Sequence, residues 1–107
     1  MIFQIGTALL EACVLAALSQ ADSYGYSITQ NIKKVIEVSE STFYPVLRRL
    51  QKDNFLIAYD VPFEGRNRRY YQLTELGKNK LKEYISEWER YKKDVDKILS
   101  ERSVEDE

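Results

Sequence analysis

Residues 41–53 are predicted to form a helix with one apolar face and one face suited to contact with nucleic acid. Phe43, Leu47 and Leu50 repeat at the spacing of a single buried stripe. The side chains left nearer solvent are Ser41, Thr42, Tyr44, Arg48, Arg49 and Lys52. Hydroxyl groups at the start of such a helix can reach base edges, and the two arginines one turn later can hold phosphates. Taken alone, this charged face would be an ordinary solvated surface.

A second basic segment favours nucleic-acid binding over an ordinary solvated surface. Arg66, Arg68 and Arg69 lie within four residues at a turn between two predicted strands. A hairpin turn needs backbone flexibility, and three like charges beside one another repel. The repulsion is offset when phosphates lie opposite, because each neutralised phosphate releases counterions. Together, the arginine turn and the arginine face of residues 41–53 favour binding to double-stranded DNA over a neutral scaffold role.

Residues that would support catalysis or metal binding are scarce in this chain of 107 residues. It has no histidine, which is the commonest general base and a common zinc ligand. The single cysteine, Cys13, cannot form an internal disulfide, and its apolar surroundings favour core filling over redox sensing. The carboxylate pair Glu83 and Glu87 is expected on an exposed helical face among lysines. We therefore expect no enzyme, no metal site and no cofactor.

The positive charge is confined to the middle of the chain, although the net charge is −1. Residues 33–72 contain eight basic and five acidic side chains, whereas the segments on either side each carry a net charge of −2. A strongly basic coat over the whole chain is excluded, and the basic part is the part that contains the arginines described above.

The apolar segment of residues 7–18 is predicted to be a buried helix. A signal peptide needs a positively charged start, but no Lys or Arg precedes Lys33. Glu11 interrupts the apolar run, which is also shorter than the roughly 18 residues that a membrane span requires. We therefore expect a cytoplasmic protein without membrane contact.

Hydrophobic periodicity and turn residues predict the elements that position these side chains. Helices are expected over residues 7–19, 24–36 and 41–53, and extended segments over 55–63 and 68–74. A turn at 64–67 joins the extended segments, and a last helix runs from its N-cap Thr74 to about residue 100. This order predicts a mainly α fold with a small β-hairpin, a winged helix-turn-helix with one long C-terminal helix. The helix over 41–53 would then enter the major groove.

Local features of two helices can also be predicted. The expected buried stripe of the helix over 24–36 is Ile28, Ile32 and Val35. Either Ser39 or Ser41 can supply the N-cap oxygen of the next helix. Pro45 must lie close to the start of that helix, where its missing N–H does least harm.

The last helix carries an apolar seam that is longer than its own domain needs. The seam residues, spaced alternately by three and four, are Leu81, Tyr84, Trp88, Tyr91, Val95 and Ile98. Leu76 and Leu81 can pack back on the domain, but the seam from Tyr91 onward lacks a partner in its own chain. A second copy is the simplest partner, so we expect a homodimer. The expected organisation is a DNA-binding domain over 1–74, a dimerisation helix over 75–102 and an acidic tail over 103–107.

Two segments resemble PadR-type transcriptional regulators. Residues 41–50, STFYPVLRRL, are similar to the recognition helix of that family. Residues 65–77, GRNRRYYQLTELG, are similar to its wing and the start of its dimerisation helix. The Tyr24-Gly25-Tyr26 sequence also fits, and it adds Tyr24 to the expected DNA-contacting residues. The resemblance covers about residues 8–100 and implies a winged-helix fold, dimeric repressors and, in many members, a response to small aromatic compounds.

The chain is most similar to the short subfamily, and within it to multidrug-responsive repressors. In such members, a tryptophan at the position of Trp88 faces its symmetry mate and stacks flat ligands. The resemblance therefore implies a ligand site formed by Trp88 with Tyr84 and Tyr91, although Trp88 could instead be only an interface anchor. Lys92 replaces an acidic residue that would favour cationic ligands, which leaves the ligand charge open.

Together these patterns predict a dimeric repressor that a small aromatic ligand releases from its operator. The alternatives are a ligand-independent regulator and a winged-helix module that binds other proteins.

Overall fold

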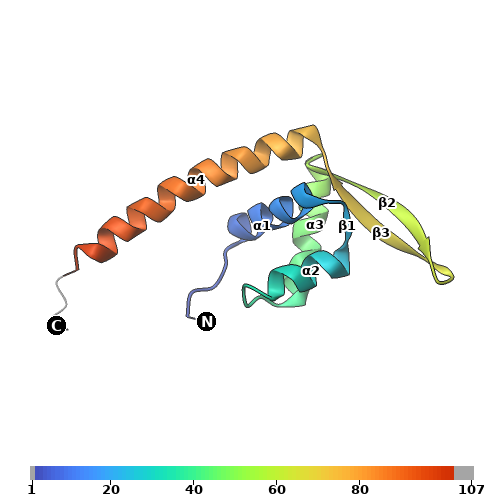
Figure 1. The fold of residues 1–107 in the computed structure, drawn as a ribbon, viewed down its shortest axis with the longest axis horizontal. Coiled ribbons are helices and arrows are strands. Elements are labelled where there is room, and N and C mark those ends of the chain that lie inside the picture. The colour runs from blue at the N-terminus through green and yellow to red at the C-terminus, as the bar shows by residue number, and fades with distance from the viewer. Residues whose placement is uncertain (1, 103–107) are drawn as a thin grey trace.

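The computed structural model describes residues 2–102 of the chain. The helices are α1 (Thr7–Gln20), α2 (Gly25–Lys33), α3 (Phe43–Lys52) and α4 (Glu75–Ser100), and a 3-10 turn, η1 (Glu40–Thr42), precedes α3. The strands are β1 (Ser23–Tyr24), β2 (Leu56–Phe63) and β3 (Arg66–Leu73). The predicted fold class, mainly helical with a small hairpin and a long last helix, is confirmed (Figure 1). The predicted acidic tail over 103–107 lies outside the described residues.

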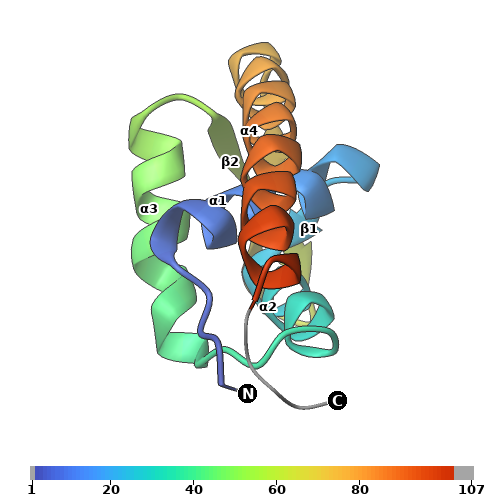
Figure 2. The same ribbon diagram turned by 90° about the vertical axis from the view of Figure 1, so that its left-hand side faces the viewer.

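Helix α1 lies at the centre of the fold, between α3 and α4 (Figure 2). Its apolar sequence is explained by this position, because it also contacts α2 and β3. Leu10, Val14 and Leu15 of α1 are completely buried. The predicted apolar stripe of α3 faces the same core, with Phe43, Val46, Leu47 and Leu50 all buried. The core therefore fixes which face of α3 remains outside.

The sheet contains three antiparallel strands in the order β1-β3-β2. Its short first strand was not predicted, because Ser23–Tyr24 pairs only with Tyr70 and Tyr71, far along the chain. The hairpin register runs from Leu56 opposite Leu73 to Phe63 opposite Arg66. The β2 and β3 arrows extend away from the helices (Figure 1).

The hairpin turn is shorter than the predicted turn over 64–67. It consists of Glu64 at φ 49° and Gly65 at φ 80°. Two successive positive φ angles are typical of a two-residue turn whose twist matches that of the strands, and the second position favours glycine. As a result, β3 begins at Arg66, two residues earlier than expected.

The prediction for the end of α2 was wrong by three residues. The helix ends at Lys33. Just beyond it, the Val35 N–H donates to the Ile32 carbonyl three residues earlier, a 3-10-type bond that is tighter than the four-residue bond of an α-helix. Ile28 and Ile32 are buried as expected, but Val35 is 79% exposed.

The two serines predicted as alternative caps of α3 do not cap it. The Ser39 and Ser41 hydroxyls lie 2.8 Å apart and bond to each other instead. Pro45 is the third residue of α3, in the first turn as predicted.

The start of α4 is fixed against the hairpin by close contacts. Thr74 is its N-cap as predicted, because its Oγ1 accepts a 2.9 Å hydrogen bond from the Gly77 N–H. The same hydroxyl donates to the Asn54 carbonyl at 2.7 Å. A Cβ on Gly77 would lie 2.2 Å from the Phe55 carbonyl oxygen, so the backbones approach too closely for any other residue. These contacts set the direction in which α4 leaves the domain.

Only the first part of α4 packs on its own domain. Leu81, which could pack on the domain, is buried, whereas Leu76, which could do the same, is 51% exposed. From residue 85 to residue 102, no described side chain is buried. The elongated molecule measures 62 × 27 × 21 Å, and α4 forms its long arm (Figure 1).

Candidate nucleic-acid interface

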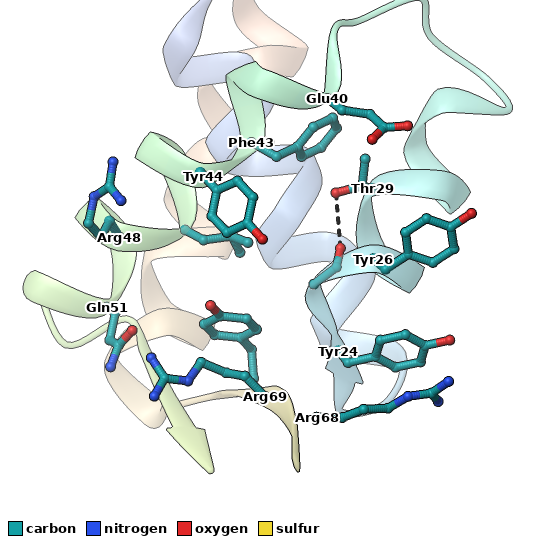
Figure 3. A pocket seen from close by; sticks show the side chains of 13 residues that line it. Tyr24, Tyr26, Thr29, Glu40, Phe43, Tyr44, Arg48, Gln51, Arg68 and Arg69 are labelled. Carbon is teal, nitrogen blue, oxygen red and sulfur yellow. Dashed lines mark hydrogen bonds between the residues drawn. The ribbon is translucent and has the colours of Figure 1, made fainter. Parts of the chain in front are cut away.

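Several residues predicted to contact DNA line one hollow of about 510 Å³ between the start of α2, α3 and the hairpin (Figure 3). They are Tyr24, Tyr44, Arg48, Arg68 and Arg69. Buried Phe43 and Leu47 form the floor of the hollow, whereas Tyr44 at its rim is 70% exposed. The hollow therefore combines a rigid apolar base with aromatic and cationic groups at the surface.

The Tyr24-Gly25-Tyr26 sequence shapes one wall of the hollow. Tyr24 is extended because it pairs with β3, and Gly25 begins α2 directly after it. The Thr29 Oγ1 donates to the Gly25 carbonyl at 2.9 Å and closes the first turn of α2. This geometry brings Tyr26, which is 65% exposed, to the rim. Sequence reasoning noted Tyr26 in the motif but did not include it among the contact residues.

Hydrogen bonds and burial shift the pKa of two other groups in the hollow. Glu40 Oε2 accepts hydrogen bonds from Lys33 at 3.0 Å and Gln30 at 3.2 Å, and both lower the pKa of the Glu40 carboxyl group. Burial raises the pKa of Tyr71, because the charged phenolate is disfavoured away from water. Because Glu40 is paired with Lys33, it opposes an approaching phosphate less than a free carboxylate would.

The hairpin of β2 and β3 is the wing of the winged helix, and its three arginines, Arg66, Arg68 and Arg69, are distributed over the two faces of β3. Side chains alternate along a strand, so Arg66 and Arg68 point to one face and Arg69 to the other. Figure 3 shows Arg69 extended toward Gln51 of α3 and Arg68 beside Tyr24. The Arg69 Nε also lies 3.7 Å from Asp60 Oδ1.

Four residues predicted for the same interface lie outside this hollow. Ser41 and Arg66 are exposed, the first in η1 and the second directly after the hairpin turn. Thr42 lines a separate hollow beside the N-terminal segment that contains Phe3. The fourth is Arg49, whose guanidinium points toward α1.

Arg49 and Tyr84, predicted for two different sites, bind the same carboxylate. The Arg49 Nε donates to Glu11 Oε2 at 2.5 Å, and the Tyr84 hydroxyl donates to Glu11 Oε1 at 2.7 Å. The Glu11 side chain is only 12% exposed. Burial and the bond to Glu11 raise the pKa of Tyr84 well above its usual range. Glu11 of α1 therefore connects α3 to α4, a link that sequence reasoning missed.

A model of the transcriptional regulator PadR-like family matches residues 14–83, which include α2, α3 and the whole hairpin. The chain belongs to the PadR-like family. Its members are transcriptional regulators, and the hollow of this PadR-like chain is accordingly its candidate DNA-binding surface.

Relatives of this PadR-like chain match it over nearly their whole length. The protein smu.1704 from Streptococcus mutans is 40% identical to this chain in sequence, and the match covers 99% of this chain and 100% of smu.1704. The crystal structure of smu.1704 superimposes on this chain with a TM-score of 0.86. A PadR family transcription regulator from Clostridium difficile is 30% identical over 84% of this chain and 97% of its own, with a TM-score of 0.77. Uncharacterized protein X from Lysinibacillus sphaericus is 37% identical over 96 residues, which are 84% of this chain and 87% of that protein.

The residues predicted to bind a ligand lie along the arm of this PadR-like regulator. Trp88 is 38% exposed and Tyr91 is 63% exposed, and their ring centroids lie 6.3 Å apart. Tyr84 is partly buried against its own domain by the bond to Glu11. Within one chain, Trp88 and Tyr91 therefore form an open aromatic surface, while Tyr84 belongs to the joint between α1 and α4.

Residues 2–102, the part of the chain that the structure describes, contain neither a metal-binding cluster nor a membrane-spanning helix. No cluster of His, Cys, Asp and Glu in this part of the chain has the arrangement of a metal site. None of its helices is both long enough and apolar enough to cross a membrane.

Proposed function

We propose that this PadR-like regulator is a homodimeric repressor and that a small planar aromatic ligand, bound between the two α4 helices, releases its operator. The observation that carries the proposal is the apolar stripe on the part of α4 beyond the domain. Ile85 is 52% exposed, Tyr91 63% and Ile98 70%. Contiguous exposed apolar side chains of this size mark an interaction surface.

A second copy of the same helix is the proposed partner for this stripe. A seam with spacings of three and four suits packing between two long helices, and pairing would bury the apolar side chains of both copies at once. Trp88 would then lie near its counterpart in the partner. Two indole rings separated by the thickness of a flat molecule could stack on both of its faces.

On the DNA side, we propose that α3 enters the major groove and the hairpin follows the backbone. Ser41, Thr42 and Tyr44 at the start of α3 would approach base edges, and Arg48 would hold a phosphate. Arg66, Arg68 and Arg69 would add phosphate contacts from the wing. The pairing of Arg49 with Glu11 favours a structural role for that arginine over a phosphate contact.

Release follows from linkage between the two sites. A ligand that binds best when the two α3 helices are wrongly spaced for DNA lowers operator affinity by the same factor by which DNA lowers ligand affinity. A dye that merely binds the exposed stripe would leave operator affinity unchanged, and its own affinity would not depend on DNA, so this reciprocal effect distinguishes the proposed inducer from such a dye.

The test begins with DNA fragments that the purified full chain retains from a random pool. Light scattering is expected to give twice the chain mass of 12.6 kDa. A planar aromatic dye should quench the emission of Trp88, the only tryptophan, and should weaken binding to the selected fragments. Trp88→Ala should lose dye binding, measured by the anisotropy of the dye because this variant has no tryptophan, whereas Trp88→Phe, the matched control, should keep the dimer.

A monomeric mass contradicts the proposed dimer and the mechanism with two half-sites. If dyes fail to quench the dimer, and Trp88→Ala dissociates into monomers, Trp88 is an interface anchor. The protein is then a regulator that acts without this ligand.

A further inference from the structure

The face of the sheet turned away from the helical core carries a row of neighbouring tyrosine rings. Tyr59 lies opposite Tyr70 in the register, and Tyr24 lies opposite Tyr70 on its other side. The Tyr24 and Tyr70 ring centroids are 5.5 Å apart, and those of Tyr59 and Tyr70 are 5.8 Å apart. The Tyr59 hydroxyl donates to Asp22 at 2.6 Å and anchors one end of the row.

Arg68 lies at the other end of this row, between two rings. Its guanidinium carbon is 3.6 Å from the centroid of the Phe63 ring and 4.2 Å from that of Tyr24. Arg68 is on the central strand, with Phe63 on the strand at one side and Tyr24 on the strand at the other. The two rings therefore flank the planar cation.

This environment distinguishes Arg68 from the other wing arginines. Arg68 is partly buried, whereas Arg66 and Arg69 are exposed, and Arg69 is near the carboxylate of Asp60. A free arginine loses much side-chain entropy when it is fixed on a phosphate. Arg68 has already lost part of that freedom, because the rings hold its guanidinium plane. The N–H groups at the edge of that plane remain suited to a phosphate.

We propose that Phe63, together with Tyr24, is a positioning residue that holds Arg68 ready for a DNA phosphate. Arg68 then makes the strongest single wing contact, although Arg66 and Arg69 are more exposed. The inference deepens the proposed function, because it rests on contact between the wing and DNA. It assigns a role to Phe63, an exposed aromatic residue at the end of β2 that contact with DNA alone does not explain.

A double-mutant cycle measured by duplex binding tests the proposal. Phe63→Leu keeps an apolar side chain but removes the ring, and it should weaken binding about fivefold, because the freed Arg68 side chain must then be ordered when DNA binds. Phe63→Tyr retains the ring and should restore affinity to within about twofold. In the Arg68→Ala background, Phe63→Leu should have almost no further effect. Ile57→Ala, on the same strand and face but at the far end of the hairpin, is the matched control and should bind normally.

The salt dependence supplies a second readout that simple damage to the hairpin would not produce. Arg68→Ala should reduce the slope of log affinity against log salt by about 0.9, because one phosphate contact is lost. Phe63→Leu should leave the slope unchanged, since the contact is still made but from a less ordered arginine. The Arg68 Nε–H resonance of the free protein should also shift in Phe63→Leu, because the ring no longer lies over it.

Two results would overturn the proposal, and they can be told apart. If Phe63→Leu weakens binding equally with and without Arg68, the ring supports the hairpin and does not position Arg68. In that case contact between the wing and DNA survives, because Arg68→Ala still lowers the slope. If Arg68→Ala changes neither affinity nor slope, Arg68 does not contact DNA, and this part of the proposed DNA interface fails together with the positioning role.

Discussion

Arg48 and Arg49 are neighbours in the sequence, but they should respond to alanine substitution in opposite ways. Arg48 lines the hollow beside Tyr44, where its charge is available to a phosphate. Arg49 donates to Glu11, a carboxylate whose side chain is only 12% exposed. Arg48→Ala should therefore weaken DNA binding with little loss of stability, and Arg49→Ala should lower stability with little change in DNA binding.

The size of each effect follows from these surroundings. Loss of one phosphate contact in Arg48→Ala should lower the salt slope by about 0.9. Arg49→Ala leaves the Glu11 carboxylate with one of its two bonds unmade, which typically costs about 1–3 kcal/mol. The Arg49 side chain is 42% exposed, so water screens the pair and a value of about 1–2 kcal/mol is expected. For a domain of this size, that corresponds to a fall in Tm of about 5–15 °C.

Two measurements on the same preparations separate the variants. Anisotropy of a labelled duplex, titrated at several salt concentrations between about 50 and 200 mM, gives the slope, and circular dichroism gives Tm. In a Glu11→Gln background, Arg49→Ala should cost much less, because the ion pair is already lost. A reduction of the slope by Arg49→Ala equal to that of Arg48→Ala would refute the assignment, since Arg49 would then hold a phosphate.

Three further substitutions test the packing and the titration of single groups. Gly77→Ala should destabilise the fold by about 1–3 kcal/mol despite the better helix propensity of alanine, because its Cβ would lie 2.2 Å from the Phe55 carbonyl oxygen. Gly65→Ala should cost about 1 kcal/mol, since the turn holds this residue at φ 80°. Tyr84→Phe should reduce the loss of stability above pH 10, because burial and Glu11 raise the pKa of Tyr84 in the folded state, whereas the unfolded chain ionises near pH 10.

Each of these three predictions has a control within the chain, and thermal or chemical unfolding measures all of them. Gly25→Ala serves for Gly77, because its nearest neighbours would lie at an ordinary 3.8 Å. Gly6→Ala serves for Gly65, because nothing lies within 4 Å of its Cβ position. Tyr26→Phe serves for Tyr84, because the Tyr26 side chain is 65% exposed. Equal effects in a variant and its control would contradict the corresponding explanation.

The parts of the fold predicted well from the sequence are those set by local periodicity. The buried face of α3 and the cap at Thr74 depend on residues within one or two turns, so their spacing is sufficient to identify them. Strand β1 could not be identified in this way, because two residues form a strand only when β3 lies beside them. Val35 was misplaced for a related reason: it continues the apolar spacing of α2, but the helix has already ended.

In the candidate site, too, the features set by local sequence were predicted and those set by distant residues were not. The basic face and the arginine turn were visible in the sequence, but the direction of each arginine was not. Successive helical residues point about 100° apart, so Arg48 and Arg49 cannot share one direction. Arg49 lies one turn after buried Val46 and is brought to Glu11, which is 38 residues away in the chain. Long-range pairs of this kind depend on how α1 packs against α3, which periodicity does not encode.

The link through Glu11 bears on how a ligand could release the operator in the proposed dimer. Glu11 bonds to both α3 and α4, and the close approach at Gly77 fixes the root of α4, so the arm and the hollow form one body. A ligand that separates the two arms should then change the spacing between the two α3 helices without altering either hollow. Binding to a duplex with one half-site should be insensitive to the ligand, whereas binding to two half-sites should weaken. Equal weakening on both duplexes would mean that the ligand deforms the hollow itself and that the bonds of Glu11 do not hold the arm and the hollow together.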